Sequence, residues 1–246
     1  MRTLSDIKDG LEKSEFYLEF MPTVRLSDAT CVGAEALIRW KRKGEIIAPL
    51  DFIPRIENTP IAGLLTYWVI EEIGRELGTW LHENDDVHIG INVPPEIIGR
   101  GGLEYATKNA GLLDVSQKLI IEITERGIPD ELAIEAIGFA KEIRCAVDDF
   151  GTGDLNLLQL SKINVDVIKI DKAFVDQIQD QQWVPRMIKG LVAFARALET
   201  EIIAEGVETE VQASTLKELS VDMAQGYFYS KPLGIGDFLE FYDKAK

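Results

Sequence analysis

Apolar and polar residues follow two different spacings along this chain. Short apolar runs, several of them alternating with polar residues, predict strands, and longer stretches with apolar residues three or four positions apart predict amphipathic helices. The expected strands are residues 16–24, 31–40, 87–93, 118–125, 144–150, 166–171, 201–208 and 223–229. The expected helices include residues 60–82, 130–143 and 172–198. Strands and helices therefore alternate from the second strand onward.

The connections between these elements indicate the fold class. Residues 25–30 ("RLSDAT"), between the first two strands, are too few for a helical crossover, so these two strands are expected to pair antiparallel. The alternation that follows reaches about eight strands, which predicts an α/β fold in which a closed (β/α) barrel has an irregular start. A doubly wound open sheet is the alternative. It is disfavoured because no phosphate-loop fingerprint follows the first strand.

Length and composition are those of an ordinary globular protein. The 246 residues contain 46% apolar residues and no linker, low-complexity tract or repeat, so we expect one domain over residues 1–246. The first residues do not form an export signal, and no apolar run approaches the roughly 20 residues that span a bilayer. We expect a cytoplasmic protein with no membrane insertion. Cys31 and Cys145 lie in apolar runs and are expected to be buried, reduced thiols.

The net charge of −16 argues against binding to polymeric nucleic acid, which requires a basic surface. Most of the carboxylates are expected to be solvated at the surface. A few fall inside apolar runs, where a carboxylate needs hydrogen bonds, a proton or a bound cation.

Polar residues collect near one end of the predicted strands. Because the C-terminal ends of parallel barrel strands open at one face, these residues are expected to converge there. They are Asn92, Glu122, Glu125, Asp148, Asp149, Lys169, Asp171, Glu205, Glu208 and Gln225. Taken singly, each has a simpler explanation: a strand-end Asn, Lys or Gln usually caps a loop, Asp148 could cap the following helix, and Glu205 could be a solvated rim residue.

The set as a whole requires more than these explanations. Two like charges about 4 Å apart repel by roughly 4 kcal/mol at an effective dielectric constant of 20. Five or more carboxylates beside one lysine therefore need cations, and oxygen ligands favour Mg²⁺, Mn²⁺ or Ca²⁺. Adjacent Asp148 and Asp149 suggest a carboxylate that bridges two ions, as in two-metal hydrolases. His82 and His88 do not fit this set, since one is expected at a helix end and the other before the ligand end of a strand.

Five motifs occur in the order "EALIRW", "IEITE", "DDFGTG", "IKIDKAFV" and "AEGVET". With this order and spacing the chain resembles the EAL-domain family of bacterial cyclic di-GMP phosphodiesterases, over residues 16–233 approximately. The resemblance implies a TIM-like (β/α)8 barrel with one antiparallel strand near the N-terminus. It also implies two divalent cations, Mg²⁺ or Mn²⁺, with Ca²⁺ binding but inhibitory, and hydrolysis of cyclic di-GMP to linear pGpG.

The resemblance also implies roles for individual residues. The implied metal ligands are Glu35, Asn92, Glu122, Asp148, Asp149 and Glu205. The implied catalytic residues are Lys169, which contacts the attacking water, Glu205, and Glu125, which anchors the loop after "DDFG". The implied substrate-binding residues are Glu35, Leu37, Arg39, Asp171, Glu208 and Gln225, with Arg39 gripping a phosphate. Homodimerisation through residues 151–156, and sensory or diguanylate-cyclase-like domains outside this chain, such as those of a membrane-attached sensor, are further family expectations.

The chain departs from the family pattern at three places. Met21 replaces a glutamine that contacts substrate in many members, Pro94 replaces a common serine, and Asp154-Leu155-Asn156-Leu157 replaces Tyr-Ser-Ser-Leu. The alternative function is therefore a cyclic di-GMP receptor that binds without turnover. An unrelated metal-dependent barrel enzyme is a third possibility, disfavoured by five ordered motifs.

Overall fold

The computed structural model describes residues 3–94, 97–98, 101–124, 143–151 and 165–246. The strands in these ranges are β1 (Phe16–Arg25), β2 (Cys31–Arg42), β3 (Glu45–Ile47), β4 (His88–Asn92), β5 (Leu119–Thr124), β6 (Arg144–Phe150), β7 (Val167–Ile170), β8 (Glu201–Ala204) and β9 (Met223–Ala224). The helices are α1 (Leu4–Glu12), α2 (Pro49–Ile56), α3 (Pro60–Glu83), α4 (Gly102–Asn109), the 3₁₀ helix η2 (Leu113–Lys118), α7 (Lys172–Val175), α8 (Trp183–Ala197), α9 (Glu210–Glu218) and α10 (Ile235–Lys244).

Eight of these strands close into a barrel, as predicted. Their order is β1-β9-β8-β7-β6-β5-β4-β2, and pairing of β1 with β2 completes the circle. β1 runs antiparallel to both of its neighbours, and every other neighbouring pair in the circle is parallel. The fold is therefore an α/β, TIM-like barrel with one antiparallel strand near the N-terminus, and not a doubly wound open sheet.

The ninth strand, β3, was not predicted. It pairs antiparallel with the end of β2, and the two strands are joined by Lys43 and Gly44. Both residues have left-handed backbones, with φ of 52° and 85°. Two successive left-handed residues form the tight turn that matches the twist of a hairpin. Three residues are too few to show an alternating pattern, which is why the sequence analysis missed this strand.

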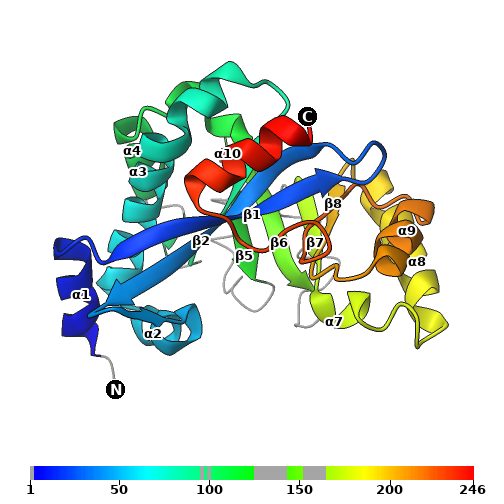
Figure 1. Cartoon of the computed structure of the whole chain (residues 1–246), viewed down its shortest axis with the longest axis horizontal. Coiled ribbons are helices and arrows are strands. Elements are labelled where there is room, and N and C mark those ends of the chain that lie inside the picture. The colour runs from blue at the N-terminus through cyan, green and yellow to red at the C-terminus, as the bar shows by residue number, and fades with distance from the viewer. Residues whose placement is uncertain (1–2, 95–96, 99–100, 125–142, 152–164) are drawn as a thin grey trace.

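Helices cover the outside of the barrel in two groups (Figure 1). α3 and α4 lie on one side of the strands, and α8 and α9 lie on the other. α10 crosses beside β1, where its Phe238 and Tyr242 are buried in the same apolar cluster as Ile73 and Leu77 of α3. Within the described ranges, no helix combines the length and the apolar character needed to cross a bilayer.

Inside the barrel, the side chains form layers. An apolar layer fills the middle, formed by the buried cluster Val32, Ile120, Ala146, Val167, Ile203 and Met223. Because side chains alternate along a strand, residues two positions after Ile120, Ala146, Val167, Ile203 and Met223 face the C-terminal mouth. Arg144 and Glu201, two positions before Ala146 and Ile203, face the opposite end. On β6, for example, Arg144, Ala146 and Asp148 lie one above the other. The apolar layer therefore separates two polar ends of the barrel.

Two predicted elements differ in extent. The predicted helix 172–198 is two helices, α7 and α8, because Pro185 fits only the first turn of a helix and obstructs the turn before it. The predicted strand 223–229 ends at Ala224. At Gly226 the chain passes so close to the Val207 backbone that a β-carbon would lie 2.2 Å from its carbonyl oxygen, and a turn follows.

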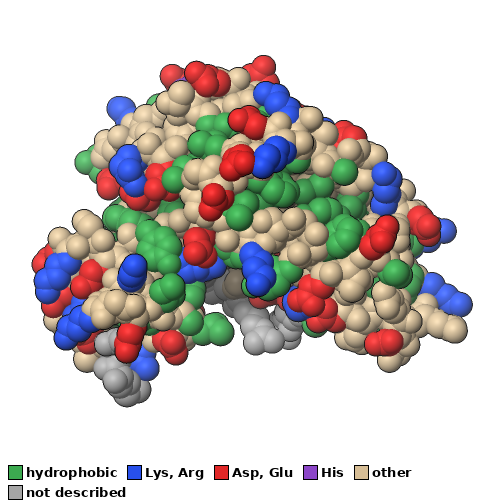
Figure 2. Space-filling model, viewed as in Figure 1, with side chains coloured by type: hydrophobic (Ala, Val, Ile, Leu, Met, Phe, Trp, Pro, Cys, Tyr) green, Lys and Arg blue, Asp and Glu red, His purple; other side chains and the backbone are tan. Residues whose placement is uncertain are grey.

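Other features agree with the sequence analysis or lie outside the described residues. Cys31 and Cys145 are free and buried, as predicted. Acidic side chains are spread over the face shown in Figure 2, with basic side chains among them. The predicted helix 130–143 lies outside the described residues except at its last position, and the loop 151–156 lies outside them beyond Gly151.

Candidate active site

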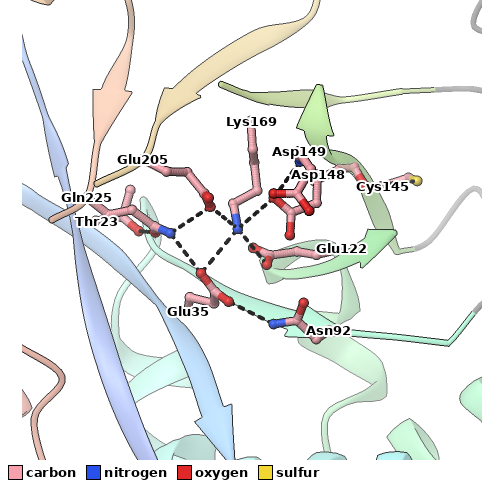
Figure 3. Close-up of polar contacts among 11 residues, drawn as sticks. Thr23, Glu35, Asn92, Glu122, Cys145, Asp148, Asp149, Lys169, Glu205 and Gln225 are labelled. Atoms are coloured by element: carbon pink, nitrogen blue, oxygen red, sulfur yellow. Dashed lines mark hydrogen bonds and ion pairs between the residues drawn. The ribbon is translucent and has the colours of Figure 1, made fainter. Parts of the chain in front are cut away.

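Four carboxylates converge on the ammonium group of Lys169 in the mouth of the barrel (Figure 3). Lys169 Nζ lies 2.6 Å from Glu205 Oε1, 2.8 Å from Glu122 Oε2, 3.1 Å from Glu35 Oε2 and 3.5 Å from Asp148 Oδ1. Lys169 lies on β7, and Glu205 follows directly after β8. Glu122, Glu35 and Asp148 lie on β5, β2 and β6, in that order. The side chain of Lys169 is only 1% exposed. The fold thus brings together charged residues that are remote in the sequence.

Amide side chains hold two of the carboxylates in place. Gln225 donates from Nε2 to Glu35 Oε2 at 2.7 Å and to Glu205 Oε1 at 3.0 Å. Asn92 donates from Nδ2 to Glu35 Oε1 at 2.7 Å, and Thr23 donates to Gln225 Oε1 at 3.4 Å. Both oxygens of Glu35 therefore accept hydrogen bonds, which fixes the orientation of its carboxylate.

Local structure at β4 makes room for Glu122. Gly90 lies beside Ile120 in the register of the parallel strands, and Asn92 lies beside Glu122. A β-carbon on Gly90 would lie 2.1 Å from Glu122 Oε1, far inside a normal contact. Glycine in a strand interior often marks such a close approach. The Glu122 carboxylate reaches Lys169 because residue 90 has no side chain.

Asp148 and Asp149 occupy an irregularity in β6. The register with β7 shifts between Val147 and Phe150, and Asp149 has a left-handed backbone with φ of 56°. Its N–H donates to Asp148 Oδ1 at 3.0 Å. Such a bulge changes the direction of successive side chains, so that both carboxylates can serve one site. Cys145, at the other end of β6, points away from the carboxylates in Figure 3.

The charges in this cluster shift one another's pKa values. Burial works against ionisation of Glu35, but the charge of Lys169 and the hydrogen bonds from Gln225 and Asn92 outweigh it and lower the Glu35 pKa. Burial raises the pKa of Glu122 well above its usual value, and the charge of Glu35 raises it further. Burial opposes the charge on Lys169, yet the surrounding carboxylates raise its pKa well above the usual value.

Glu205 and Asp149 are also harder to ionise than usual. Burial raises the Glu205 pKa to about 8, against the attraction of Lys169 and with help from the charges of Asp148 and Glu35. Burial, the charge of Asp148 and a hydrogen bond with Asp171 raise the Asp149 pKa to about 6. Raised values among buried carboxylates indicate a site that has more negative charge than its own residues neutralise.

The donor atoms suit hard divalent cations. Asp148, Asp149 and Glu205 each offer a carboxylate oxygen, and these oxygens lie within 4.8 Å of one another. One ammonium among four carboxylates leaves an excess of three negative charges when all are ionised. An all-oxygen donor set with excess negative charge is typical of Mg²⁺, Mn²⁺ and Ca²⁺ sites. The residues present fit such ions.

Arg39 and Leu37 lie farther along β2 than Glu35, on the same face of the strand. Arg39 Nε donates to Glu19 Oε2 at 2.7 Å, and its guanidinium also donates to the carbonyl oxygen of Ile38. Both side chains of the Arg39–Glu19 pair are partly exposed, at 18% and 29%. Arg39 thus stands at the rim of the mouth, with an acidic partner that the sequence analysis did not identify.

The remaining predicted site residues lie around the cluster. Asp171 caps α7 by accepting from the N–H of Ala173 at 2.8 Å. Glu208 is exposed and pairs with Lys172 Nζ at 2.9 Å. These contacts place both residues outside the four carboxylates that surround Lys169. Glu125 lies outside the described residues.

Two residues that shape the site, Thr23 and Gly90, were not predicted from the sequence, and a third, Met21, was noted only through the family resemblance. Thr23 supports Gln225, and Gly90 admits Glu122; the glycine within an apolar strand was the available signal for the second. Met21 lies directly opposite Glu35 in the β1–β2 register. The departure from the family pattern at residue 21 is therefore adjacent to the carboxylate cluster.

Comparison with known proteins gives matches over nearly the whole chain. The family model described as "EAL domain" matches residues 4–232. Over 244 residues the chain is 31% identical to "Probable cyclic di-GMP phosphodiesterase PdeB" of Escherichia coli (strain K12), covering 97% of this chain and 46% of PdeB. The chain therefore spans about half the length of that curated relative.

Solved structures show the same fold. "Structure of EAL Enzyme Bd1971 - cAMP and cyclic-di-GMP bound form" has a TM-score of 0.89 and 29% identity, covering 97% of this chain and 67% of that one. "PaMucR Phosphodiesterase, c-di-GMP complex" has a TM-score of 0.86 and 28% identity, covering 96% of this chain and 98% of that one.

Proposed function

The chain belongs to the EAL-domain family, and on that premise we propose that it is a phosphodiesterase that hydrolyses cyclic di-GMP to linear pGpG with two divalent cations. The observation that carries the proposal is the convergence of Glu35, Glu122, Asp148 and Glu205 on Lys169. Relatives named as cyclic di-GMP phosphodiesterases, and a related phosphodiesterase solved in complex with c-di-GMP, support the choice of substrate.

The cations would be held by the carboxylates in the mouth. Asp148, Asp149 and Glu205 offer oxygens close enough to share an ion, and Glu35, Glu122 and Asn92 complete the oxygen-rich wall. When bound, two divalent cations activate water and offset the charge on the phosphoryl oxygens. Hydrolysis balances as follows: the water oxygen forms a bond to one phosphorus, one P–O ester bond breaks, and the released oxygen takes a proton.

The residues of the chain position this reaction. Lys169 is buried, keeps its proton and donates toward the carboxylates, so it suits orienting a water better than accepting a proton from it. Glu35 is held by Asn92 and Gln225 in one orientation. Arg39 would exchange its partly exposed partner Glu19 for a substrate phosphate, since a guanidinium binds phosphate through two parallel hydrogen bonds.

The acidic net charge does not oppose this function. Cyclic di-GMP carries two phosphodiester charges, and the cations and Arg39 would meet them locally. Long-range repulsion from exposed carboxylates is screened within about 8 Å at physiological ionic strength.

The alternative is a receptor that binds cyclic di-GMP without turnover. The observation that favours it is Met21, which lies opposite Glu35 where the family pattern has a polar glutamine. An apolar thioether cannot donate two hydrogen bonds as a glutamine amide can. Loss of that contact would weaken substrate positioning while leaving the carboxylate cluster intact.

A turnover assay separates the two functions. The purified chain is incubated with cyclic di-GMP and Mg²⁺, Mn²⁺ or Ca²⁺, and products are identified by chromatography and mass. We expect pGpG with Mg²⁺ or Mn²⁺ and little with Ca²⁺, whose looser coordination orients water poorly. The matched control is Glu35→Gln, which keeps the side-chain shape and removes the charge. Tight binding without product, under each cation and across protein concentrations, would establish the receptor function instead.

A further inference from the structure

A second polar cavity lies at the opposite end of the barrel from the carboxylate cluster. Its volume is about 580 Å³, within the range of about 300–1,000 Å³ usual for small-molecule sites. It is lined by residues at the end of β1 and at the starts of β4, β6 and β8, together with the loops beside them. The apolar middle layer of the barrel separates it from the mouth. We call it the basal cavity.

The charge of the basal cavity is opposite in sign to that of the whole protein. Five basic side chains line it, against four carboxylates, although the chain as a whole has 26 basic and 42 acidic residues. The basic residues are Arg25, Lys118, Arg144, Arg196 and Lys217, and the acidic residues are Asp85, Asp86, Glu201 and Asp222. A local excess of positive charge in an acidic protein favours an anion as ligand.

Three of these basic groups have partners that a ligand can displace. Arg25 pairs with Asp86 and Asp28, whose side chains are 84% and 47% exposed, and Arg144 pairs with Glu201, which is 46% exposed. Exposed ion pairs contribute little to stability, so a ligand oxyanion competes with them at small cost. Lys217 Nζ donates to a carbonyl oxygen, that of Ser27 at 2.9 Å. That partner carries no charge.

His88 is the second, independent sign of a ligand. It is only 6% exposed and lines the cavity, yet its ring makes no hydrogen bond to any residue in the described part of the chain. Its ring is therefore available to a ligand in the cavity. Gly33 leaves space for the ring, since a β-carbon there would lie 2.8 Å from His88 Cδ2.

The protonation of His88 also suits an anion held by arginines. Burial lowers the His88 pKa to about 3, and the positive charges of Arg144, Lys169 and Arg25 also lower it. The negative charge of Asp86 acts in the opposite direction and raises it. A neutral imidazole presents one N–H donor and one acceptor nitrogen to the cavity. His88, Arg25 and Arg144 all line this one cavity.

We infer that the basal cavity binds a small organic phosphate ester, with its phosphate on Arg25 and Arg144 and a hydrogen bond from His88. The planar fork of a guanidinium matches two phosphate oxygens, and a dianionic phosphate gains more than a single carboxylate from two such forks. Val32, Val221 and Met223 provide apolar wall for the organic part of the ligand. This inference does not depend on the proposed phosphodiesterase activity, because the two sites share no residue.

Binding of phenyl phosphate to the whole chain tests the inference. Calorimetric titrations are run in EDTA, so that the carboxylates of the mouth hold no cations and repel the probe. We expect saturable one-to-one binding of phenyl phosphate that is tighter than binding of benzoate. Arg144→Gln is expected to weaken it at least tenfold. Arg186→Gln, which removes an exposed charge elsewhere on α8, is expected to leave it unchanged.

Three results would overturn the inference: no saturable binding above a chloride control of equal ionic strength, equal or tighter binding of benzoate, or unchanged affinity in Arg144→Gln. If Arg144→Gln does not fold, Arg25→Gln replaces it, because the Arg25 side chain is 34% exposed and its partner Asp86 is 84% exposed. That variant is expected to weaken binding at least threefold. Unchanged affinity there would count against the inference in the same way.

Discussion

Gly90→Ala tests whether the position of one carboxylate controls the candidate active site. The added β-carbon would lie 2.1 Å from Glu122 Oε1, whereas an ordinary contact begins at 3.4 Å. The carboxylate must therefore move by about 1.3 Å, the difference between these two distances. Glu122 Oε2 lies only 2.8 Å from Lys169 Nζ, so a movement of that size breaks the hydrogen bond between them.

Gly90→Ala is expected to reduce the rate of hydrolysis far more than the stability of the fold. The atom in conflict is the end of a flexible side chain, and residue 90 has no left-handed backbone, so the barrel still folds. Loss of a charged hydrogen bond costs about 1.5–3 kcal/mol, and replacing glycine by alanine returns about 0.4–1 kcal/mol. The net loss of unfolding free energy is therefore about 0.5–2.6 kcal/mol. Misplacing a reacting group by about 1 Å costs on the order of 100-fold in rate.

Two measurements check this prediction: the rate of cyclic di-GMP hydrolysis and the affinity for Mn²⁺ by titration calorimetry. Both are expected to fall, the rate by about 100-fold. The matched control is Gly78→Ala on α3, where an added β-carbon meets nothing within 4 Å and stability should rise by about 0.5–1 kcal/mol. Unchanged rate and Mn²⁺ affinity in folded Gly90→Ala would refute the assigned position of Glu122 in the site.

Three further variants probe the charges of the cluster. Lys169→Met should abolish turnover yet raise Mn²⁺ affinity at least about tenfold, because an ammonium within 3.5 Å of four carboxylates competes with a cation. In the metal-free protein Glu205 has a pKa of about 8, whereas the ordinary value that applies to the unfolded chain is 4.5. Its contribution to the free energy of unfolding is therefore lost as pH rises between these two values. Thermal melts over this range should show a smaller fall in melting temperature with pH for Glu205→Gln than for the wild type. Asp149→Gly should stabilise the metal-free protein by about 1 kcal/mol, by relieving a left-handed backbone, and weaken Mn²⁺ binding.

Each of these variants has an outcome that contradicts its basis. Lower Mn²⁺ affinity in Lys169→Met would mean that the ammonium supports the cation site instead of competing with it. Parallel pH profiles for wild type and Glu205→Gln would show that the proton resides on another carboxylate of the cluster. If Asp149→Gly melts at a lower temperature, the β6 irregularity is held by contacts of the Asp149 side chain rather than strained by it.

Much of the barrel could be predicted because the local pattern of apolar residues indicates which segments are buried. An apolar run such as "VIKI" must be buried on both faces, and the helical spacing that begins at Pro60 must pack one face, whatever the rest of the chain does. The eight barrel strands and the antiparallel start follow from such runs and from one short connection. β3 and the break between α7 and α8 were missed because a three-residue strand and a single proline leave weak signals.

The kinds of residue at the candidate site were also visible in the sequence, since charged residues inside apolar runs have few structural explanations. The tertiary structure alone decided how they meet. Lys169 and Glu35 are 134 positions apart, and only closure of the barrel sets their separation at 3.1 Å. The same holds for the space that Gly90 leaves and for the position of the His88 ring in the basal cavity. A sequence specifies which side chains must escape water, because that depends on each residue and its near neighbours. Which of them then share one cavity depends on strands that are distant in the chain, and no local pattern records it.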